Sequence, residues 1–351
     1  MRLGLLGCGS VAHWIHGPAI RGIPGATLVG AADPDPRARA RVARALGTPV
    51  CERAEDLLAR SDIDAVVICV PTYLHADLAI AAAASGKHLY LEKPLATTLA
   101  DARAVIEAVS RAGVTAAVGF NRRLHPLFEQ ARRILASGAI GRVSGVQAAF
   151  CEPAPAGGLP DWKRRRSSGG GALLDLASHH VDHLRWTLGE EIAAASASIR
   201  SDSSEHDSAR LELETESGVS VQGYFSFRGG LADYLEFVGE RGTLRVDRHS
   251  AELSVRVARR RGYGTRRRWV APSPATLAWR LERLWRPAAD PSYRRSLRAF
   301  IECCRGGPAG PTASLADGLR SLEVVLAAEG AAAGGRVAPV ERRETGACAS
   351  C

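Results

Sequence analysis

The chain has 351 residues, with 46 Lys or Arg against 37 Asp or Glu and a formal net charge of +9. This length is enough for two domains with a large core, and a hydrophobic content of 46% is ordinary for a globular protein. No uninterrupted apolar run reaches about eighteen residues, so no integral membrane segment is predicted. The eight cysteines lack zinc-site spacing in the folded region, so no metal site is predicted and the reducing cytoplasm is the expected compartment.

The first third of the chain alternates short apolar strands with helices. Strands are expected at 2–7, 26–32, 64–70, 87–91 and 114–119, and helices after the first strand and at 36–46, 75–85 and 98–112. Alternation with short connections is typical of a parallel sheet that is covered on both faces. The sequence therefore predicts an α/β Rossmann domain over residues 1–120.

After Asn121 the pattern changes. A helix at 126–137, a strand at 141–150, a loop at 151–168 and a helix at 172–188 precede strands with alternating apolar residues from 192 to 247. This predicts an α+β domain over 121–335 with a large, mostly antiparallel open sheet, ending in a helix at about 313–330. Residues 336–351 are expected to be a flexible tail. An open sheet face often forms a subunit contact, so a homodimer or homotetramer is expected.

A dinucleotide-binding turn follows the first strand. The segment Gly7-Cys8-Gly9-Ser10-Val11-Ala12 matches G-x-G-x-x-A between a strand and a helix. Gly7 permits the tight turn, Gly9 lets a pyrophosphate approach the backbone, and Ala12 lets helix and sheet pack closely. Asp33, at the end of the second strand, is placed to bind ribose hydroxyls and to repel a 2′-phosphate. These features favour NAD, although the nearby Arg37 leaves the use of NADP open.

Further cofactor contacts are expected where other strands of this sheet end. Pro71 and Thr72 follow the central apolar strand, at the edge where cofactors cross an open α/β sheet. His75 is placed for a pocket role or for a helix start, and the helix start is favoured. Glu92 and Lys93 follow the next strand. Pro94 restricts Lys93 and can hold a cis bond, so the lysine is expected to be rigidly aimed.

A lysine, an aspartate and a histidine are the candidate catalytic residues. Asp175 and His179 are four apart in the predicted 172–188 helix, so they share a face. His179 is expected to accept a proton, Lys93 to polarise an alcohol oxygen, and Asp175 to orient the histidine or to bond a substrate hydroxyl. The glycines at 169–171 are expected to leave the helix start open to substrate. The alternative of Asp175, His179 and His183 as metal ligands lacks a further ligand motif.

These motifs together resemble the Gfo/Idh/MocA oxidoreductases, the glucose–fructose oxidoreductase and inositol dehydrogenase group. The resemblance covers nearly the whole chain. Besides the segments above, it is carried by Gly119-Phe-Asn-Arg-Arg123 and Phe237-Val-Gly-Glu-Arg-Gly-Thr-Leu244. It implies a Rossmann domain, a substrate domain on an open sheet, and NAD(P)-dependent oxidation or reduction of a ring hydroxyl on a sugar, sugar derivative or inositol. The family's catalytic residues fall on Lys93, Asp175 and His179.

The resemblance also suggests substrate contacts and shows departures from the family pattern. Asn121 and Arg123 fall where family members often line the pocket, and Trp162 and Lys163 are expected to contact substrate as well. Arginines at 164–166 are unusual before the glycines, and the long segment 256–290 is rich in arginine. This segment fits a solvated basic loop with a short packed helix, and the arginines otherwise suggest an anionic substrate such as a nucleotide-linked sugar. Contact of this basic, Trp- and Leu-containing segment with a membrane surface is a further alternative.

Three functions follow from these residues. The leading hypothesis is an NAD(P)-dependent sugar or inositol dehydrogenase. The second is an epimerase or glycosidase-type enzyme in which NAD is reduced and reoxidised within one turnover. The third is a non-catalytic NAD-binding regulator, which the intact Lys93, Asp175 and His179 disfavour. No nucleic-acid partner is expected, because the basic residues accompany no matching fold motif.

Overall fold

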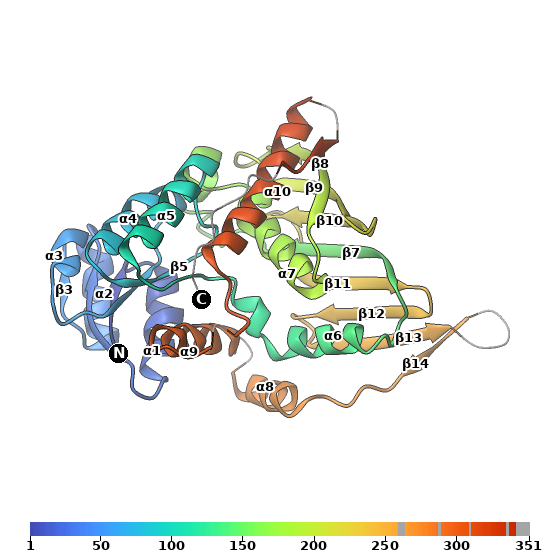
Figure 1. The fold of residues 1–351 in the computed structure, drawn as a ribbon, viewed down its shortest axis with the longest axis horizontal. Helices are drawn as coiled ribbons and strands as arrows, with labels where there is room; N and C mark the ends of the chain where they lie inside the picture. The colour runs from blue at the N-terminus through green and yellow to red at the C-terminus, as the bar shows by residue number, and fades with distance from the viewer. Residues whose placement is uncertain (259–263, 287–288, 309, 335–336, 342–351) are drawn as a thin grey trace.

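Two β-sheets lie side by side in the computed structural model of the chain, with a long helix running between them (Figure 1). The structure describes residues 1–258, 264–286, 289–308, 310–334 and 337–341. Within these residues, no helix is both long and apolar enough to cross a membrane.

The first sheet has six parallel strands in the order β3-β2-β1-β4-β5-β6. The chain reverses its direction of progress across the sheet after β3, so the carboxyl ends of β1 and β4 flank a switch point of the kind that binds ligands in open α/β sheets. The strands of this sheet are β1 (Arg2–Leu6), β2 (Thr27–Ala32), β3 (Val50–Cys51), β4 (Ala65–Ile68), β5 (His88–Leu91) and β6 (Ala116–Val118).

Helices connect these strands and have local reasons for their bounds. Asp35 accepts a hydrogen bond from the Arg37 backbone amide and begins α2, and Gly47, in a left-handed conformation, ends it. Thr98 likewise begins α5. The helices and helical turns are η1 (Ala12–His16), α1 (Gly17–Arg21), α2 (Pro36–Leu46), α3 (Ala54–Leu58), η2 (Thr72–Leu74), α4 (His75–Ala84) and α5 (Leu99–Ala112).

The second sheet has nine strands in the order β14-β13-β12-β11-β7-β10-β9-β8-β15, and all neighbouring pairs are antiparallel except β7 with β10. Alternate residues of these strands are buried, as Leu211 and Leu213 of β9 are. The strands are β7 (Val143–Cys151), β8 (Ile192–Arg200), β9 (Ser208–Thr215), β10 (Ser220–Ser226), β11 (Ala232–Gly239), β12 (Gly242–Asp247), β13 (Glu252–Ala258), β14 (Thr265–Arg268) and β15 (Ala338–Pro339).

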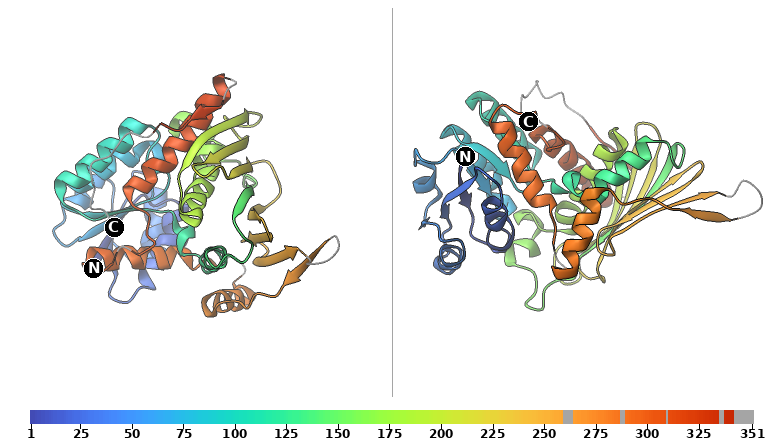
Figure 2. Two further views of the ribbon diagram at one scale, coloured as in Figure 1. Left: turned by 45° about the vertical axis from the view of Figure 1, so that its right-hand side comes forward. Right: turned by 90° about the horizontal axis from the view of Figure 1, so that it is seen from below.

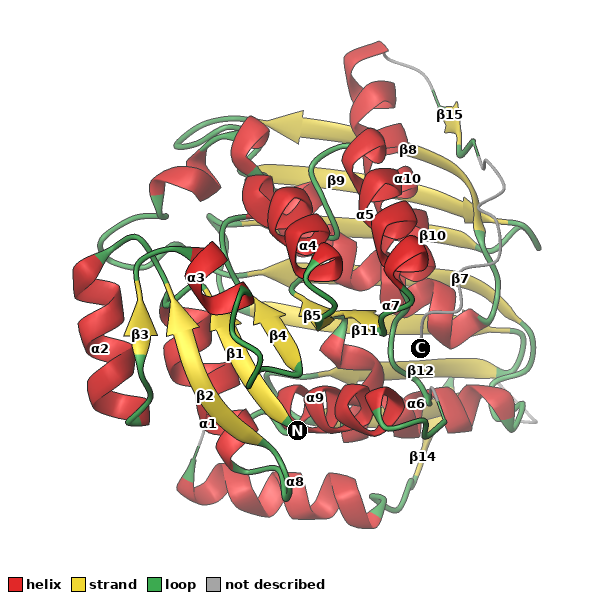
Figure 3. Cartoon of the chain, turned by 60° about the vertical axis from the view of Figure 1, so that its left-hand side comes forward, coloured by secondary structure: helices red, strands yellow, loops and turns green. Residues whose placement is uncertain are grey.

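Helices of the second half cover one face of this sheet, as Figure 3 shows for α6, α7 and α10. The helices and helical turns are η3 (Asn121–Leu124), α6 (Pro126–Ala136), η4 (Asp161–Arg164), η5 (Arg166–Ser168), η6 (Ala172–Ala177), α7 (Ser178–Leu188), α8 (Pro274–Trp285), α9 (Ser292–Cys304) and α10 (Leu315–Gly334). The elements η1 and η6 are π-helical turns that open the helices after the two glycine-rich segments, and such turns are frequent at functional sites.

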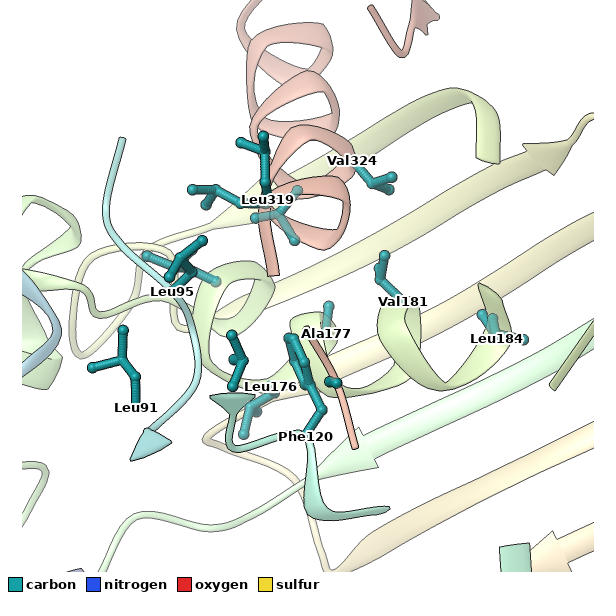
Figure 4. Close-up of a cluster of buried hydrophobic side chains, with 14 of the residues drawn as sticks. Leu91, Leu95, Phe120, Leu176, Ala177, Val181, Leu184, Leu319 and Val324 are labelled. Carbon is teal, nitrogen blue, oxygen red and sulfur yellow. The ribbon is translucent and has the colours of Figure 1, made fainter. Parts of the chain in front are cut away.

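A shared apolar core joins the two halves. Figure 4 shows Leu91 and Leu95 from the first half facing Leu176 of η6 and Leu319 of α10. All four side chains are almost fully buried. Burial of this kind contributes about 1.5–3 kcal/mol for each large apolar side chain, so the halves stabilise each other.

Helix α9 comes from the far end of the chain but packs on the first half. Its residues Leu297, Phe300 and Ile301 are buried with Leu3 and Leu5 of β1 in a second core. The Tyr90 hydroxyl of β5 also lies 2.9 Å from the Ser296 hydroxyl. Residues 1–120 therefore do not complete their own core, and the predicted division at residue 120 stays a prediction.

The predicted fold class is confirmed, and the differences from the predicted elements are local. The chain from 338 to 339 forms β15 beside β8, so this part of the predicted flexible tail is ordered, whereas 342–351 lie outside the described residues. The segment 256–290, considered a basic loop with a short packed helix, contains the end of β13, the strand β14 and the helix α8. The views in Figure 2 show that β13 and β14 project from the body of the molecule.

Candidate active site

The glycine-rich turn after β1 has the geometry of a phosphate cradle. At Gly7, with φ of +95°, an added Cβ would lie 2.6 Å from the Cys69 carbonyl oxygen, so the turn depends on glycine here. At Gly9, an added Cβ would meet no heavy atom within 4 Å. Ser10 and Val11 are exposed, and Ala12 is buried against the sheet. The open backbone at Gly9, next to the start of a helix, fits the pyrophosphate of a dinucleotide.

Asp33 lies beside this turn at the end of β2. One carboxylate oxygen accepts the Cys8 backbone N–H at 2.7 Å, and the other accepts the Asp35 backbone N–H at 2.8 Å. Each oxygen keeps the capacity for a further hydrogen bond, so the half-exposed carboxylate can still accept ribose hydroxyls. Arg37 is exposed on α2, and its backbone amide bonds Asp35.

Glu92, which follows β5, is hydrogen-bonded to the helical turn after the glycine-rich segment. Its carboxylate accepts a hydrogen bond from His16 Nε2 at 2.6 Å and one from the Lys93 backbone amide at 3.2 Å. Burial raises the pKa of Glu92, but the hydrogen bond and charge of His16, together with the Lys93 charge, bring it below the ordinary value. His16 was not predicted as a site residue, because it lies in the π-helical turn η1 and belongs to no motif.

His75 supports the same segment from α4, which begins at this residue. Its Nδ1 lies 2.8 Å from the Pro94 carbonyl oxygen and its Nε2 lies 3.1 Å from that of Val70. The side chain is buried, and the expected cis bond is found between Lys93 and Pro94. His75 thus links the ends of β4 and β5, and its predicted contact with cofactor remains a prediction.

Lys93, Asp175 and Lys163 form a close ionic cluster. Lys93 Nζ donates to Asp175 Oδ1 at 2.5 Å and to the Asp175 carbonyl oxygen at 2.8 Å, and Lys163 Nζ donates to Asp175 Oδ2 at 2.7 Å. Burial alone would raise the pKa of Asp175, but the charges and hydrogen bonds of Lys163 and Lys93 lower it well below its usual range. Burial lowers the pKa of Lys163, yet Asp175 raises it above the ordinary lysine value. The cluster therefore carries two positive charges and one negative charge.

The glycines at 169–171 build this cluster rather than leaving the helix start open. An added Cβ on Gly169 would lie 2.3 Å from Thr72 Cβ, and one on Gly170 would lie 2.1 Å from the Lys163 carbonyl oxygen. The expectation of an open helix start was wrong, because these glycines let the 161–168 loop fold back against Thr72. That close approach carries Lys163 to Asp175.

His179 lies next to the cluster, and its ring is packed against aromatic side chains. The centroid of its imidazole lies 6.3 Å from that of Phe120 and 6.0 Å from that of Phe150. Its Nδ1 is buried without a hydrogen-bond partner among the described residues. Burial is the main cause that lowers the pKa of His179 well below 6.5, and the Lys93 and Arg122 charges lower it further. His179 is therefore neutral at neutral pH. Asp175 bonds the two lysines and makes no described bond to His179, so its expected orienting role finds no support.

Several predicted residues lie in structural interactions. Asn121 donates to the Ser292 hydroxyl at 2.7 Å. Arg123 is buried, with Nε 2.9 Å from Asp182 Oδ2 and Nη2 3.0 Å from Asp317 Oδ1. These contacts occupy both side chains, so their contact with substrate is still only a prediction. Trp162 is half-exposed, and Lys163 Nζ lies 5.3 Å from its ring centroid.

The alternative metal site does not form. His183 is buried with its ring 4.3 Å from that of Phe128, and its Nε2 lies 3.3 Å from the Thr187 hydroxyl. In the described part of the chain, no three His, Cys, Asp or Glu side chains converge as metal ligands.

A buried ion network that the sequence analysis missed lies behind His179. Arg122 Nη1 donates to Asp233 at 2.7 Å, Arg248 Nε donates to the same carboxylate at 2.5 Å, and Arg248 Nη1 lies 3.3 Å from Asp290. The partners are 15 to 111 residues apart in the sequence, so no local pattern could identify them. Arg122 also stacks over Phe150 at 4.2 Å, which fixes the aromatic wall beside His179.

Comparison with known proteins identifies the family of the chain. Residues 1–120 match the model of the oxidoreductase family with an NAD-binding Rossmann fold, and residues 128–245 match the GFO/IDH/MocA C-terminal domain. Inositol 2-dehydrogenase of Rhizobium meliloti (strain 1021) is 34% identical over 273 residues, which cover 75% of this chain and 80% of that protein.

Two further similar proteins are named for, or crystallised with, nucleotide sugars. The dTDP-3,4-didehydro-2,6-dideoxy-alpha-D-glucose 3-reductase of Streptomyces antibioticus is 30% identical over 250 residues, which cover 71% of this chain and 76% of that enzyme. A similar solved structure is that of the WlbA dehydrogenase from Bordetella pertussis in complex with NADH and UDP-GlcNAcA. It superposes on this chain with a TM-score of 0.82 and 24% identity, and the match covers 98% of both chains. This similarity shows a shared fold. The chain belongs to the Gfo/Idh/MocA oxidoreductases and has their NAD-binding Rossmann domain followed by their C-terminal domain.

Proposed function

We propose that this protein is an NAD-dependent dehydrogenase that oxidises a ring hydroxyl of inositol or of a neutral sugar. The observation that carries the proposal is the Lys93–Asp175–Lys163 cluster beside a neutral His179, at the edge of the sheet that holds the dinucleotide turn. When bound, NAD accepts a hydride from the carbon that bears the hydroxyl.

Lys93 is the proposed partner of the reacting oxygen. Its ammonium group donates to the carboxylate and the carbonyl oxygen of Asp175, and its backbone amide donates to Glu92, so the side chain is oriented before substrate arrives. As the hydroxyl loses its proton and the carbon loses its hydride, negative charge develops on the oxygen. A fixed ammonium group stabilises that charge in the transition state more than the neutral alcohol.

His179 is the proposed proton acceptor. A base must be unprotonated to act, and the lowered pKa of His179 keeps it neutral at physiological pH. The alcohol would thus give its proton to His179 while its hydride left to the bound cofactor, and the product would be a ketone. The His179→Ala variant should lose about 10²–10⁴-fold in kcat. Undiminished turnover by this variant would refute the assignment, provided that its affinity for NAD is unchanged.

Asp175 and Lys163 are the proposed supports of Lys93. With two lysines on one carboxylate, the cluster keeps one net positive charge for the developing oxyanion. The Asp33 carboxylate, which two backbone amides hold in place, would favour NAD over NADP, because it could accept ribose hydroxyls and would repel a 2′-phosphate.

The arginines before the glycines give little support to an anionic substrate. Arg166 forms a bidentate pair with Glu329, in which Nε donates to Oε1 and Nη2 donates to Oε2, both at 2.7 Å, and its backbone amide donates to Glu205. Arg164 and Arg165 are exposed. This arrangement, together with the similarity to inositol 2-dehydrogenase, favours a neutral polyol over a nucleotide-linked sugar.

Absorbance at 340 nm tests the proposal directly. The purified protein is mixed with NAD or NADP and with inositol isomers, free sugars or nucleotide sugars in turn. Reduction of NAD by an inositol or a neutral sugar is the expected result. Reduction only by nucleotide sugars would overturn the substrate class. Sugar rearrangement without net NADH would instead indicate transient redox.

We further propose a cytoplasmic homodimer or homotetramer that associates through the uncovered face of the nine-stranded sheet. That face presents exposed side chains such as Tyr224, which is 46% exposed. Light scattering coupled to size exclusion should give a mass of two or four chains, and the Tyr224→Asp variant should lower it. A monomer at micromolar concentration would refute the assembly.

A further inference from the structure

Helix α8 has two faces of opposite character, and its inward face is fixed to the body. Trp279 is buried, with Nε1 2.8 Å from the Ala289 carbonyl oxygen and its ring 4.5 Å from that of His125. Arg280 and Arg283 donate inward to backbone carbonyls of the β12–β13 region. The helix is therefore held in place without its outward side chains.

The outward face is apolar. Leu277, Leu281, Leu284 and Trp285 stand at i, i+4, i+7 and i+8, so they form one stripe along the helix, and they are 47%, 53%, 73% and 87% exposed. Trp269, which directly follows β14, is 81% exposed. Together these five residues are called the outward stripe. Scattered exposed leucines are common, but four exposed apolar residues along one helix face, with a further exposed tryptophan after the strand that precedes the helix, mark an interaction surface.

The sequence segment that contains the outward stripe has a net charge equal to that of the whole chain. Residues 256–286 contain ten arginines and a single acidic residue, Glu282, which gives a net charge of +9. This equals the formal net charge of the entire chain, and the remainder contains 36 basic and 36 acidic residues. Arg266, Arg267 and Arg268 of β14 are all exposed.

We propose that the outward stripe and β14 form a peripheral attachment site for an anionic lipid membrane. Leucine and tryptophan on one helix face enter the boundary between headgroups and acyl chains, while adjacent arginines bind lipid phosphates. A second copy of the chain is a poorer partner, because it would bring an equal excess of positive charge to the contact. Nucleic acid would satisfy the arginines but would leave the leucines in water.

Vesicle flotation of the full-length protein tests this site. Vesicles of phosphatidylcholine alone are compared with vesicles that contain about one-third phosphatidylglycerol, at low and at physiological ionic strength. The protein should float with the anionic vesicles only, and less at higher salt. Neutralising Arg266, Arg267 and Arg268 to Gln should weaken binding about 100-fold, since each surface arginine is worth about fivefold.

A matched pair of variants assigns the surface. Leu281→Asp combined with Leu284→Asp should abolish flotation. Leu231→Asp, which changes a side chain that is 65% exposed outside this segment, should leave it intact. Circular dichroism and thermal unfolding establish that each variant is folded. The altered leucines are outside the proposed catalytic cluster, so this test is independent of the dehydrogenase proposal.

Three results would overturn the inference. The first is an absence of flotation with anionic vesicles, and the second is equal flotation of the folded double variant. The third is a lower assembly mass in the double variant by light scattering without vesicles, because a second copy would then cover the outward stripe.

Discussion

Replacing Lys163 by methionine removes one of the two cations that hold Asp175 and leaves Lys93 in place. Methionine keeps most of the side-chain volume, so the main change is the loss of the ammonium group 2.7 Å from Asp175 Oδ2. Breaking a buried ion pair completely costs about 3–5 kcal/mol, but Asp175 retains Lys93 here. We therefore expect a loss of about 1.5–3 kcal/mol of transition-state stabilisation, which corresponds to a rate lower by roughly 10–100-fold.

The loss should appear in kcat. With one lysine left, the cluster has no net charge, so it stabilises the developing oxyanion less while the neutral substrate binds almost as before. The assay is initial-rate kinetics at saturating NAD with the substrate that the 340 nm panel identifies. Substrate deuterated at the reacting carbon adds a second readout, because slower hydride transfer raises the kinetic isotope effect. Lys163→Arg, which keeps the charge, is the matched control and should retain kcat within about threefold.

A particular result would refute this reasoning. If Lys163→Met raises KM and leaves kcat and the isotope effect unchanged, Lys163 contributes to substrate binding alone. If Lys163→Arg loses as much activity as Lys163→Met, the shape of the side chain matters and its charge does not.

Three further variants test other parts of the structure. Asp33→Asn keeps an acceptor for the Cys8 amide but removes the charge. The ratio of kcat/KM with NAD to kcat/KM with NADP should therefore fall by an amount equivalent to about 1–2 kcal/mol. An unchanged ratio would contradict the role of that charge. Gly170→Ala would place Cβ 2.1 Å from the Lys163 carbonyl oxygen, so it should lower the free energy of unfolding in urea by about 1–3 kcal/mol. The control is Gly157→Ala, whose Cβ would meet no atom within 4 Å and which should cost far less. Equal losses in the two variants would refute the close-approach argument. Burial lowers the pKa of His125 to about 4, from its ordinary 6.5. Between these two pH values the unfolded chain binds the proton more readily than the folded chain does. The free energy of unfolding should therefore fall by about 3 kcal/mol as the pH drops from about 6.5 towards 4. His125→Asn retains an acceptor for the Leu127 amide and should flatten this dependence in urea unfolding at pH 5 and pH 7, and an undiminished slope would assign it to other groups.

The sequence predicted the features that depend on local pattern. The dinucleotide turn, the parallel strands and the position of Lys93 at a strand end follow from short motifs and from apolar runs. Since the carboxyl ends of parallel strands meet at one edge of a sheet, the approach of this edge to the 172–188 helix was also foreseeable. The structure brings Lys93 and Asp175 into contact, while the catalytic roles given to them remain predictions.

Features that depend on residues far apart in the sequence could not be predicted from it. Lys163 reaches Asp175 only because the loop folds back at Gly169 and Gly170, and its path depends on Thr72, almost a hundred residues earlier. Arg123 is paired with Asp317, which lies 194 residues away. Helix α9 did have a usable signal, because Leu297, Phe300 and Ile301 recur at helical spacing. Which sheet they cover is set by tertiary packing.

The position of α9 has a consequence for how the polypeptide matures during its synthesis. Domains usually fold as they leave the ribosome, the N-terminal one first. In this chain, the Rossmann half lacks Leu297, Phe300 and Ile301 until translation passes Cys304, so its apolar surface beside β1 stays uncovered through most of elongation. A fragment that stops near residue 120 would keep that surface exposed after release and is expected to aggregate, whereas chains that end beyond α9 can close it.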